Sequence, residues 1–166
     1  MKKTNTTTKI DETAVMIDQL KKEVDEGLST TEKSLPSKYF YDKIGDALFI
    51  KIMHLPEYYV TRSEHEIFKT QSETIIEALQ LKPDTYFDLI ELGAGDGLKT
   101  KELLRELDRG SYRLDYMPVD ISQNALDNLE RDLNNELPRL SINKKRGDYF
   151  EVLESIKDNQ HPKVIL

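Results

Sequence analysis

The hydrophobic positions of this chain follow a helical period in its first half and gather into short runs in its second half. Over residues 12–28, and again from 61 to about 81, apolar residues recur every three or four positions between charged ones, which predicts two amphipathic helices. The stretch 86–92 is instead almost continuously apolar and rich in strand-forming residues. It is too short for a buried helix, so it predicts a central β-strand.

Helix and strand patterns alternate from there to the last residue. Helical patterns cover 99–107, 122–133 and 150–156, and strand patterns cover 112–119, 140–145 and the stretch from Lys163. This alternation predicts an α/β fold with a parallel sheet and right-handed crossovers. Pro118 cannot donate a hydrogen bond to a neighbouring strand, so we expect it near its strand's end or beside an unpaired stretch.

A glycine-rich loop links the predicted central strand to the next helix. Gly93, Gly95 and Gly97 let the backbone turn sharply and approach a ligand that any side chain would exclude, and the helix beyond directs its free amides at that ligand. Dinucleotide-binding loops have the spacing G-x-G-x-x-G, but here the third glycine comes one residue earlier, which disfavours a nicotinamide oxidoreductase. Behind an acidic strand end, this tighter spacing resembles the first motif of S-adenosylmethionine-dependent methyltransferases. The alternative is an ordinary strand-to-helix turn.

Three acids, Glu91, Asp120 and Asp148, lie at the ends of predicted strands. Because ligands of parallel sheets bind at the carboxyl ends of the strands, we expect these acids to converge on one site. Asp120 has the position of an acid that accepts hydrogen bonds from both hydroxyls of a cofactor ribose. Asp148 is placed to accept one from an adenine amino group, with Tyr149 beside the ring. Taken singly, each acid also fits a solvated strand end.

Composition and charge narrow the class of protein. With 166 residues, 37% hydrophobic and 33% charged, the chain suits about one globular domain. Its net charge of −7 argues against nucleic-acid binding and is easier to reconcile with a small cationic cofactor or an amine substrate. The absence of cysteine excludes disulfides, thiolate zinc sites and cysteine nucleophiles, and neither His54 nor His65 has a partner at metal-ligand spacing. Without a secretory signal or a membrane-length apolar run, we expect a cytoplasmic protein with no membrane partner.

The pattern also divides the chain into regions. We expect residues 1–12 to be a disordered tail, residues 13–82 to be a helical region and residues 83–166 to form the sheet domain. Thr61 and Glu64 have the spacing of a capping box that begins the second helix. Four of the eight tyrosines lie within 38–49 and 55–64. Aromatic packing and a small polar ligand in a dry pocket both fit that concentration.

Two paired stretches resemble the histidine-specific Nα-methyltransferase family, whose best-known members make trimethylhistidine on the route to ergothioneine. They read Lys33-Ser34-Leu35-Pro36-Ser37-Lys38-Tyr39-Phe40-Tyr41-Asp42 and Leu55-Pro56-Glu57-Tyr58-Tyr59, the latter followed by Thr61-Arg62 and Glu64. The likeness continues through Gly45, Leu48-Phe49, Glu91-Leu92-Gly93-Ala94-Gly95, Lys99-Thr100, Pro118-Val119-Asp120-Ile121-Ser122, Ala125-Leu126 and Gly147-Asp148-Tyr149. It therefore reaches from about Leu28 to the last residue.

The resemblance implies a fold, a cofactor and a set of site residues. The fold is a Rossmann-like methyltransferase sheet, of which 83–166 supplies strands 1–4, after a helical region that carries the substrate site. The implied cofactor is S-adenosyl-L-methionine, and its implied contacts are Gly93, Lys99, Asp120, Asp148 and Tyr149, in addition to Glu91 and Gly95 from the loop pattern. The implied substrate contacts are Tyr41, near the amino group as the candidate catalytic residue that orients its lone pair, and Tyr58, near the side chain.

The expected function is therefore part of an enzyme that methylates the α-amino group of L-histidine by in-line displacement at the sulfonium methyl. Methylation of another amino acid or amine, or a non-catalytic cofactor-binding fragment, are the alternatives. Two departures from the family pattern matter: Val60 stands where many relatives have proline, and the family's fold continues past the fourth strand into a further substrate-binding domain. We therefore expect an N-terminal portion that is inactive by itself and less stable than the whole enzyme, with an exposed sheet edge that favours self-association.

Overall fold

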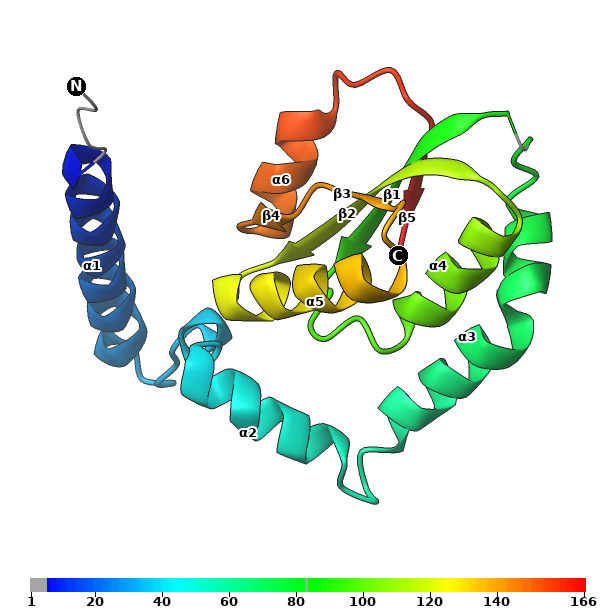
Figure 1. Cartoon of the computed structure of the whole chain (residues 1–166). Coiled ribbons are helices and arrows are strands. Elements are labelled where there is room, and N and C mark those ends of the chain that lie inside the picture. The colour runs from blue at the N-terminus through cyan, green and yellow to red at the C-terminus, as the bar shows by residue number, and fades with distance from the viewer. Residues whose placement is uncertain (1–5, 83) are drawn as a thin grey trace. The chain divides into compact units, whose positions relative to one another are not determined.

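The structure, a computed structural model, describes residues 6–82 and 84–166, and Figure 1 shows its elements in chain order. The helices are α1 (Thr6–Ser29), the short 3-10 helix η1 (Ser37–Phe40), α2 (Lys43–Met53), α3 (Tyr59–Ala78), α4 (Thr100–Arg109), α5 (Gln123–Glu136) and α6 (Tyr149–Ile156). The strands are β1 (Tyr86–Leu92), β2 (Arg113–Asp120), β3 (Ser141–Ile142), β4 (Lys145–Arg146) and β5 (Lys163–Ile165).

The chain forms two compact units that divide between Tyr39 and Phe40 rather than after residue 82. In the first unit, the segment that follows α1 returns to the helix. Glu23 accepts hydrogen bonds there from the Lys38 ammonium at 2.7 Å and from the Tyr39 hydroxyl at 2.8 Å. The second unit contains α2 and everything after it, and it carries all of the expected site residues.

The second unit is built on one parallel sheet with the order β3–β2–β1–β5, in which β4 also pairs with β2. β1 lies in the middle and pairs with β2 along its whole length, from Tyr86 opposite Arg113 to Leu92 opposite Val119. The chain moves outward from β1 to β2 and β3, and then crosses to the far side of β1. This is the strand order of one half of a Rossmann-like sheet, and it makes the carboxyl end of β1 the topological switch point. The predicted α/β fold is confirmed.

Pro118 lies opposite the break between β3 and β4. On the side of β2 that faces these strands, the Tyr116 carbonyl accepts from the Asn143 amide at 2.8 Å, and the Asp120 carbonyl accepts from the Gly147 amide at 3.2 Å. Pro118 falls midway between these two bonds and has no N–H, so the pairing lapses at its level. The expectation that Pro118 borders an unpaired stretch is confirmed, and the third strand is split into two short pieces instead of one.

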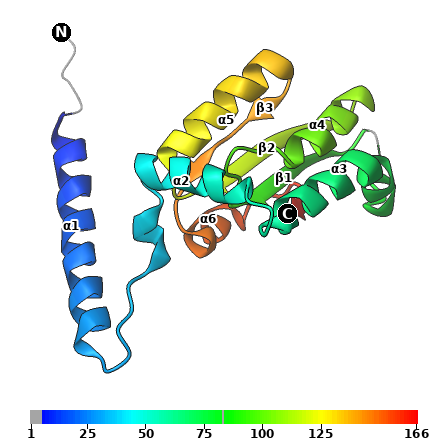
Figure 2. The same ribbon diagram turned by 90° about the horizontal axis from the view of Figure 1, so that it is seen from below.

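Helices cover both faces of the sheet, with α3, α4 and α5 on one side and α6 on the other (Figure 2). Alternation along β1 divides its residues between these faces. The larger core contains Ile76, Phe87, Leu89, Leu103, Leu104, Leu107, Leu114, Tyr116, Leu129 and Leu133. The smaller core contains Ile90, Met117, Val119, Val152 and Ile156.

Two helix boundaries differ from the prediction. α1 begins at Thr6, so residues 6–12 are helical rather than a disordered tail, while residues 1–5 lie outside the described part. α3 begins at Tyr59, two residues before the predicted capping box. Thr61 therefore lies inside the first turn rather than at the N-cap, and the Glu64 carboxylate pairs with Lys99. The predicted capping box is wrong for both reasons.

α2 was not predicted, although its N-cap was visible in the sequence. The Asp42 carboxylate accepts from the amides of Ile44 at 3.0 Å and Gly45 at 2.8 Å, which satisfies two free donors of the first turn. A Cβ at Gly45 would lie 1.5 Å from the Phe40 carbonyl oxygen, so only glycine fits where η1 meets α2. The Asp42 cap and the close approach of Gly45 to the Phe40 carbonyl together fix the turn between η1 and α2.

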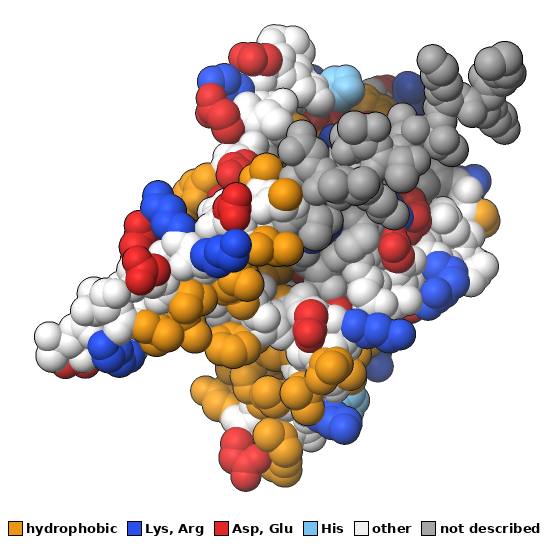
Figure 3. All heavy atoms as spheres, turned by 90° about the vertical axis from the view of Figure 1, so that its left-hand side faces the viewer, with side chains coloured by type: hydrophobic (Ala, Val, Ile, Leu, Met, Phe, Trp, Pro, Cys, Tyr) orange, Lys and Arg blue, Asp and Glu red, His pale blue; other side chains and the backbone are white. Residues whose placement is uncertain are grey.

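α2 leaves much of its hydrophobic surface exposed. Ile44 and Leu48 are 71% and 52% exposed, and Ile52 continues the same stripe one turn later. Figure 3 shows hydrophobic side chains gathered on the face of the molecule that it displays. β5 is the last strand of the sheet on its side, so its outer edge has no partner among the described strands. No described helix is long and apolar enough to span a membrane.

Candidate functional site

The glycine loop leads from the carboxyl end of β1 to α4 and is held against the end of β2. The amides of Gly93 and Ala94 both donate to the Val119 carbonyl, at 2.9 and 3.1 Å. Gly93, Gly95 and Gly97 have positive φ angles of 76°, 55° and 64°. Residues with a side chain rarely adopt this conformation, so the path of the loop depends on glycine at all three positions.

The three glycines differ in how much space a side chain would have at each position. A Cβ at Gly97 would lie 2.4 Å from Leu129 Cδ1 of α5, and a Cβ at Gly93 would lie 2.8 Å from the Tyr149 hydroxyl oxygen. At Gly95 the nearest atom would be the Gly93 carbonyl oxygen, at 3.9 Å. Gly97 therefore permits close packing of the loop on α5, whereas the space over Gly95 is open to a ligand.

Asp120 ends β2 beside this loop and binds it directly. Its Oδ2 accepts from the Gly95 amide at 3.0 Å and its Oδ1 accepts from the Ser122 amide at 2.8 Å. Because a carboxylate oxygen can accept more than one hydrogen bond, Asp120 retains capacity for ligand hydroxyls while it fixes the loop. The side chain is 9% exposed, which places this capacity in a largely desolvated position.

Asp148 and Tyr149 lie at the start of α6, at the same edge of the sheet. Asp148 caps α6, since its Oδ1 accepts from the Phe150 amide at 2.9 Å. Burial, followed by the nearby Asp120, Tyr41 and Asp148, raises the pKa of the Tyr149 phenol. The phenol therefore stays protonated at neutral pH and can donate a hydrogen bond.

Glu91 differs from the other two acids of the expected trio. Its side chain points to the face of the sheet that α4 covers, where the Thr100 hydroxyl donates to Oε1 and the Tyr116 hydroxyl donates to Oε2. The residue is 6% exposed, and burial raises the pKa of its carboxyl group. Through these two bonds Glu91 joins β1 to β2 and α4, and its predicted contact with a cofactor stays a prediction.

The buried Glu91 carboxyl leads to a pH-dependent stability. A carboxyl whose pKa is higher in the folded chain than in the unfolded chain binds more protons when folded, so the free energy of unfolding falls as pH rises from about 4.5 through the raised pKa. We expect Glu91→Gln, which can still accept from Thr100 and bond to Tyr116, to remove this fall and to be more stable than the wild type at pH 7. Urea unfolding at a series of pH values measures it, with the exposed Glu73→Gln as the control. The same pH slope in Glu91→Gln and wild type would contradict this account.

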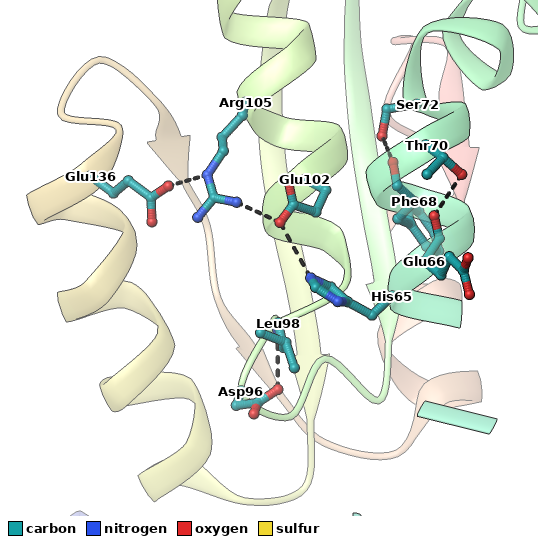
Figure 4. A network of polar contacts seen from close by, with 10 residues as sticks. All are labelled: His65, Glu66, Phe68, Thr70, Ser72, Asp96, Leu98, Glu102, Arg105 and Glu136. Atoms are coloured by element: carbon teal, nitrogen blue, oxygen red, sulfur yellow. Dashed lines mark hydrogen bonds and ion pairs between the residues drawn. The ribbon is translucent and has the colours of Figure 1, made fainter. Parts of the chain in front are cut away.

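Lys99 lies between the loop and α4 and is paired with α3. Its Nζ is 2.7 Å from Glu64 Oε2. On the same pair of helices, His65 Nε2 lies 3.3 Å from Glu102 Oε1 (Figure 4). Glu102 also accepts from Arg105 at 2.8 Å, whose guanidinium reaches on to α5. These contacts fix three helices behind the glycine loop. His65 thus has a packing role, and residues 6–82 and 84–166 contain no group of three or more side chains able to hold a metal ion.

Tyr41 and Tyr58 both contact Phe49. Both ring pairs have centroid separations of 6.1 Å and edge-on geometries, with interplanar angles of 64° for Tyr41 and 79° for Tyr58. We call these three residues the aromatic cluster. Tyr41 is also close enough to Tyr149 to contribute to the raised pKa of that phenol. The aromatic cluster therefore borders the edge that carries Asp120 and the glycine loop.

The sequence matches a known protein family over most of its length. The family model for histidine-specific, S-adenosylmethionine-dependent methyltransferases matches residues 20–166. The chain belongs to this family. It is similar to the histidine N-alpha-methyltransferase of Mycobacterium tuberculosis, with 41% identity over 138 residues, and to that of Mycolicibacterium smegmatis, with 38% identity over 137 residues. Each alignment covers 82% of this chain but 41% of the relative.

A third relative widens the comparison. The chain is 32% identical over 148 residues to the N-methyltransferase dtpB of Aspergillus flavus. This alignment covers 87% of this chain and 40% of that protein. The chain therefore spans about two fifths of the length of these three relatives. The name of the fungal relative says that it methylates a nitrogen atom and does not specify a substrate.

The geometry fits the cofactor of this methyltransferase family. The open space over Gly95 admits a ligand to the switch point, and Asp120 offers carboxylate oxygens to a ribose there. Asp148 and Tyr149 lie at the same edge, and Lys99 adds a positive charge where the loop meets α4. These residues suit a nucleoside that carries an anionic group, as S-adenosylmethionine does with its carboxylate.

Arg62 holds the turn that presents Tyr58. Its guanidinium donates to the carbonyls of Leu55 at 2.9 Å and Pro56 at 2.6 Å, while the Tyr58 amide donates to the Leu55 carbonyl at 3.1 Å. We expect Arg62→Ala to speed amide exchange at Tyr58 about tenfold, because two charge-assisted bonds are lost. Hydrogen exchange followed by NMR measures this. Arg62→Lys, which keeps the charge but not the forked geometry, should be intermediate. Wild-type exchange in Arg62→Ala would contradict the role.

Sequence reasoning missed three residues of this arrangement. Phe49 contacts both Tyr41 and Tyr58. The N-cap residue Asp42, which precedes a helix-forming run, is the signal that could have placed Phe49 on a helix. Asp46 and Ser122 meet across 76 positions of sequence, at 2.6 Å. No local pattern indicates that contact.

Proposed function

We propose that this chain forms the cofactor-binding part of a cytoplasmic, S-adenosylmethionine-dependent enzyme that methylates the α-amino group of L-histidine. The observation that carries the proposal is the bond between Asp120 Oδ2 and the Gly95 amide, 3.0 Å long, beneath the open space over Gly95. This bond supports the proposal because a carboxylate suited to a ribose, a close backbone approach and the switch point of the sheet coincide there. Membership of the histidine-specific family and the similarity to two mycobacterial histidine N-alpha-methyltransferases support the substrate.

The bound cofactor supplies a methyl group on a positively charged sulfur. That methyl group would pass to the neutral α-amine, with the electron pair of the broken carbon–sulfur bond left on sulfur and the ammonium proton lost beforehand. This chain's residues would contribute mainly by placing the reactants in line. Asp120 and Asp148 would accept hydrogen bonds from the nucleoside, Lys99 would lie near its carboxylate, and the Tyr41 hydroxyl would orient the amine.

The aromatic cluster supports a small ligand with an apolar part and a polar part. Tyr41, Phe49 and Tyr58 offer apolar ring surface, and the two phenols add hydrogen-bonding groups. The net charge of −7 also suits an amine better than a nucleic acid. The unpaired outer edge of β5 supports self-association of this chain.

Calorimetric titration of this chain with S-adenosylhomocysteine tests the proposal, with NAD⁺ as the matched nucleotide control. Saturable binding of S-adenosylhomocysteine and none of NAD⁺ supports it, and the reverse contradicts it. A methyl-transfer assay on the whole enzyme that carries this sequence then separates substrates. Preference for L-histidine supports the assignment, whereas preference for another amino acid or amine would retain the chemistry and overturn the substrate. Binding by this chain without turnover is expected, and trimethylhistidine production by the chain alone would contradict the proposal that it supplies the cofactor-binding part.

A further inference from the structure

A single carboxylate ties the helix of the aromatic cluster to the cofactor edge. Asp46 lies in the first turn of α2, and its Oδ2 accepts from the Ser122 hydroxyl at 2.6 Å and from the Asn124 side-chain amide at 3.2 Å. Both donors lie at the start of α5, 76 and 78 positions away in sequence. A negative charge at a helix N-terminus is favourable, which strengthens the contact.

Ser122 connects this carboxylate to the cofactor acid. Its hydroxyl donates to Asp46 and accepts from the Ala125 amide at 3.1 Å, while its own amide donates to Asp120 Oδ1 at 2.8 Å. Asp120 in turn accepts from the Gly95 amide. A continuous line of hydrogen bonds therefore runs from α2 through the N-cap of α5 to the glycine loop.

The other end of this line is the aromatic cluster. Phe49 lies three positions after Asp46, on the neighbouring turn of α2, and its ring contacts both Tyr41 and Tyr58. No residue of α2 is fully buried. Because hydrophobic burial contributes little to holding this helix, its position depends strongly on polar anchors such as Asp46.

We propose that Asp46 is a positioning residue that couples the cofactor site to the aromatic cluster. Ligand bonding to Asp120 strengthens the hydrogen bonds through Ser122 and Asp46, which orders α2 and fixes Phe49 against the two tyrosines. By linkage, if the ligand shifts the ordering equilibrium of α2 by some factor, ordering of α2 raises the affinity for the ligand by the same factor. The coupling rests on the proposed function for its ligand, but the anchor itself exists in the ligand-free chain.

Hydrogen exchange of the α2 amides, with and without S-adenosylhomocysteine, tests this role. In the ligand-free chain we expect Asp46→Ala to speed exchange over residues 43–53 about tenfold, since two side-chain hydrogen bonds are lost. Asp46→Asn should restore exchange to within about twofold, because its amide oxygen accepts from the same donors. Lys51→Ala, which truncates an exposed side chain of the same helix, is the matched control and should be unchanged.

The ligand then separates an anchor from a coupling residue. S-adenosylhomocysteine should slow α2 exchange in the wild type and in Asp46→Asn but not in Asp46→Ala, and Asp46→Ala should bind it about threefold to tenfold more weakly. Wild-type exchange in ligand-free Asp46→Ala overturns the proposal whatever the chain binds. Equal ligand-induced protection in Asp46→Ala and the wild type overturns the coupling. A wild-type chain that binds no ligand, with the ligand-free effect intact, contradicts the proposed function and confirms the anchor.

Discussion

Asp120→Ala is expected to weaken binding of S-adenosylhomocysteine at least about 100-fold. The substitution removes the acceptors for two ribose hydroxyls and also releases the amides of Gly95 and Ser122, which Asp120 now holds at 3.0 and 2.8 Å. Each hydrogen bond to a charged group contributes about 1.5–3 kcal/mol, so the loss of two exceeds a factor of 100 in affinity. Isothermal titration calorimetry measures the change.

Two further variants make this result specific. Asp120→Asn keeps one acceptor oxygen and should lie between the wild type and Asp120→Ala, whereas Asp127→Ala removes an exposed acid of α5 that pairs with Lys144 and should bind as the wild type does. Circular dichroism establishes that each variant is folded. Affinity within about threefold of the wild type in a folded Asp120→Ala would refute the role of Asp120.

Gly97→Ala is expected to lower the free energy of unfolding by about 2–4 kcal/mol. A side chain at this position is unfavourable for two reasons. The backbone has a φ of 64°, and the new Cβ would lie 2.4 Å from Leu129 Cδ1. Leu129 belongs to the larger core and is 1% exposed, so it cannot move aside without disturbing α5. Urea unfolding followed by circular dichroism measures the loss.

Gly95→Ala separates the two causes. Its φ of 55° is similar, but its Cβ would meet no atom closer than 3.9 Å, so only the backbone strain remains. We expect a loss of about 1 kcal/mol in stability together with weakened cofactor binding, because the new methyl group enters the open space. Equal losses of stability in the two variants would show that packing against Leu129 does not explain the glycine at position 97.

The sheet could be predicted from sequence because its signals are local. β1 and β2 are short apolar runs with turn residues after them, and a helical pattern predicts α5, which Ser122 caps by accepting from the Ala125 amide. The alternation of a strand also predicts the face on which Glu91 lies. Glu91 shares its face of β1 with Phe87 and Leu89, which places it under α4.

The rest of the site depends on contacts between distant segments. Sequence placed Tyr41 and Tyr58 in one aromatic-rich region, but Phe49 joins them only because α2 brings it there. The pairing of Lys99 with Glu64 and that of Asp46 with Ser122 each join segments more than 30 positions apart. Such contacts follow from tertiary packing, and no periodicity or motif encodes them.

A nucleoside cofactor is proposed to bind at the carboxyl ends of β1 and β2. Titration of the ¹⁵N-labelled chain with S-adenosylhomocysteine, followed by amide chemical shifts, tests this binding site. We expect saturable shifts centred on the amides of Gly93, Gly95, Ser122 and Tyr149, with little change at the opposite end of β1. The absence of shifts at these four amides, or saturable shifts confined to the unit that contains α1, would contradict it.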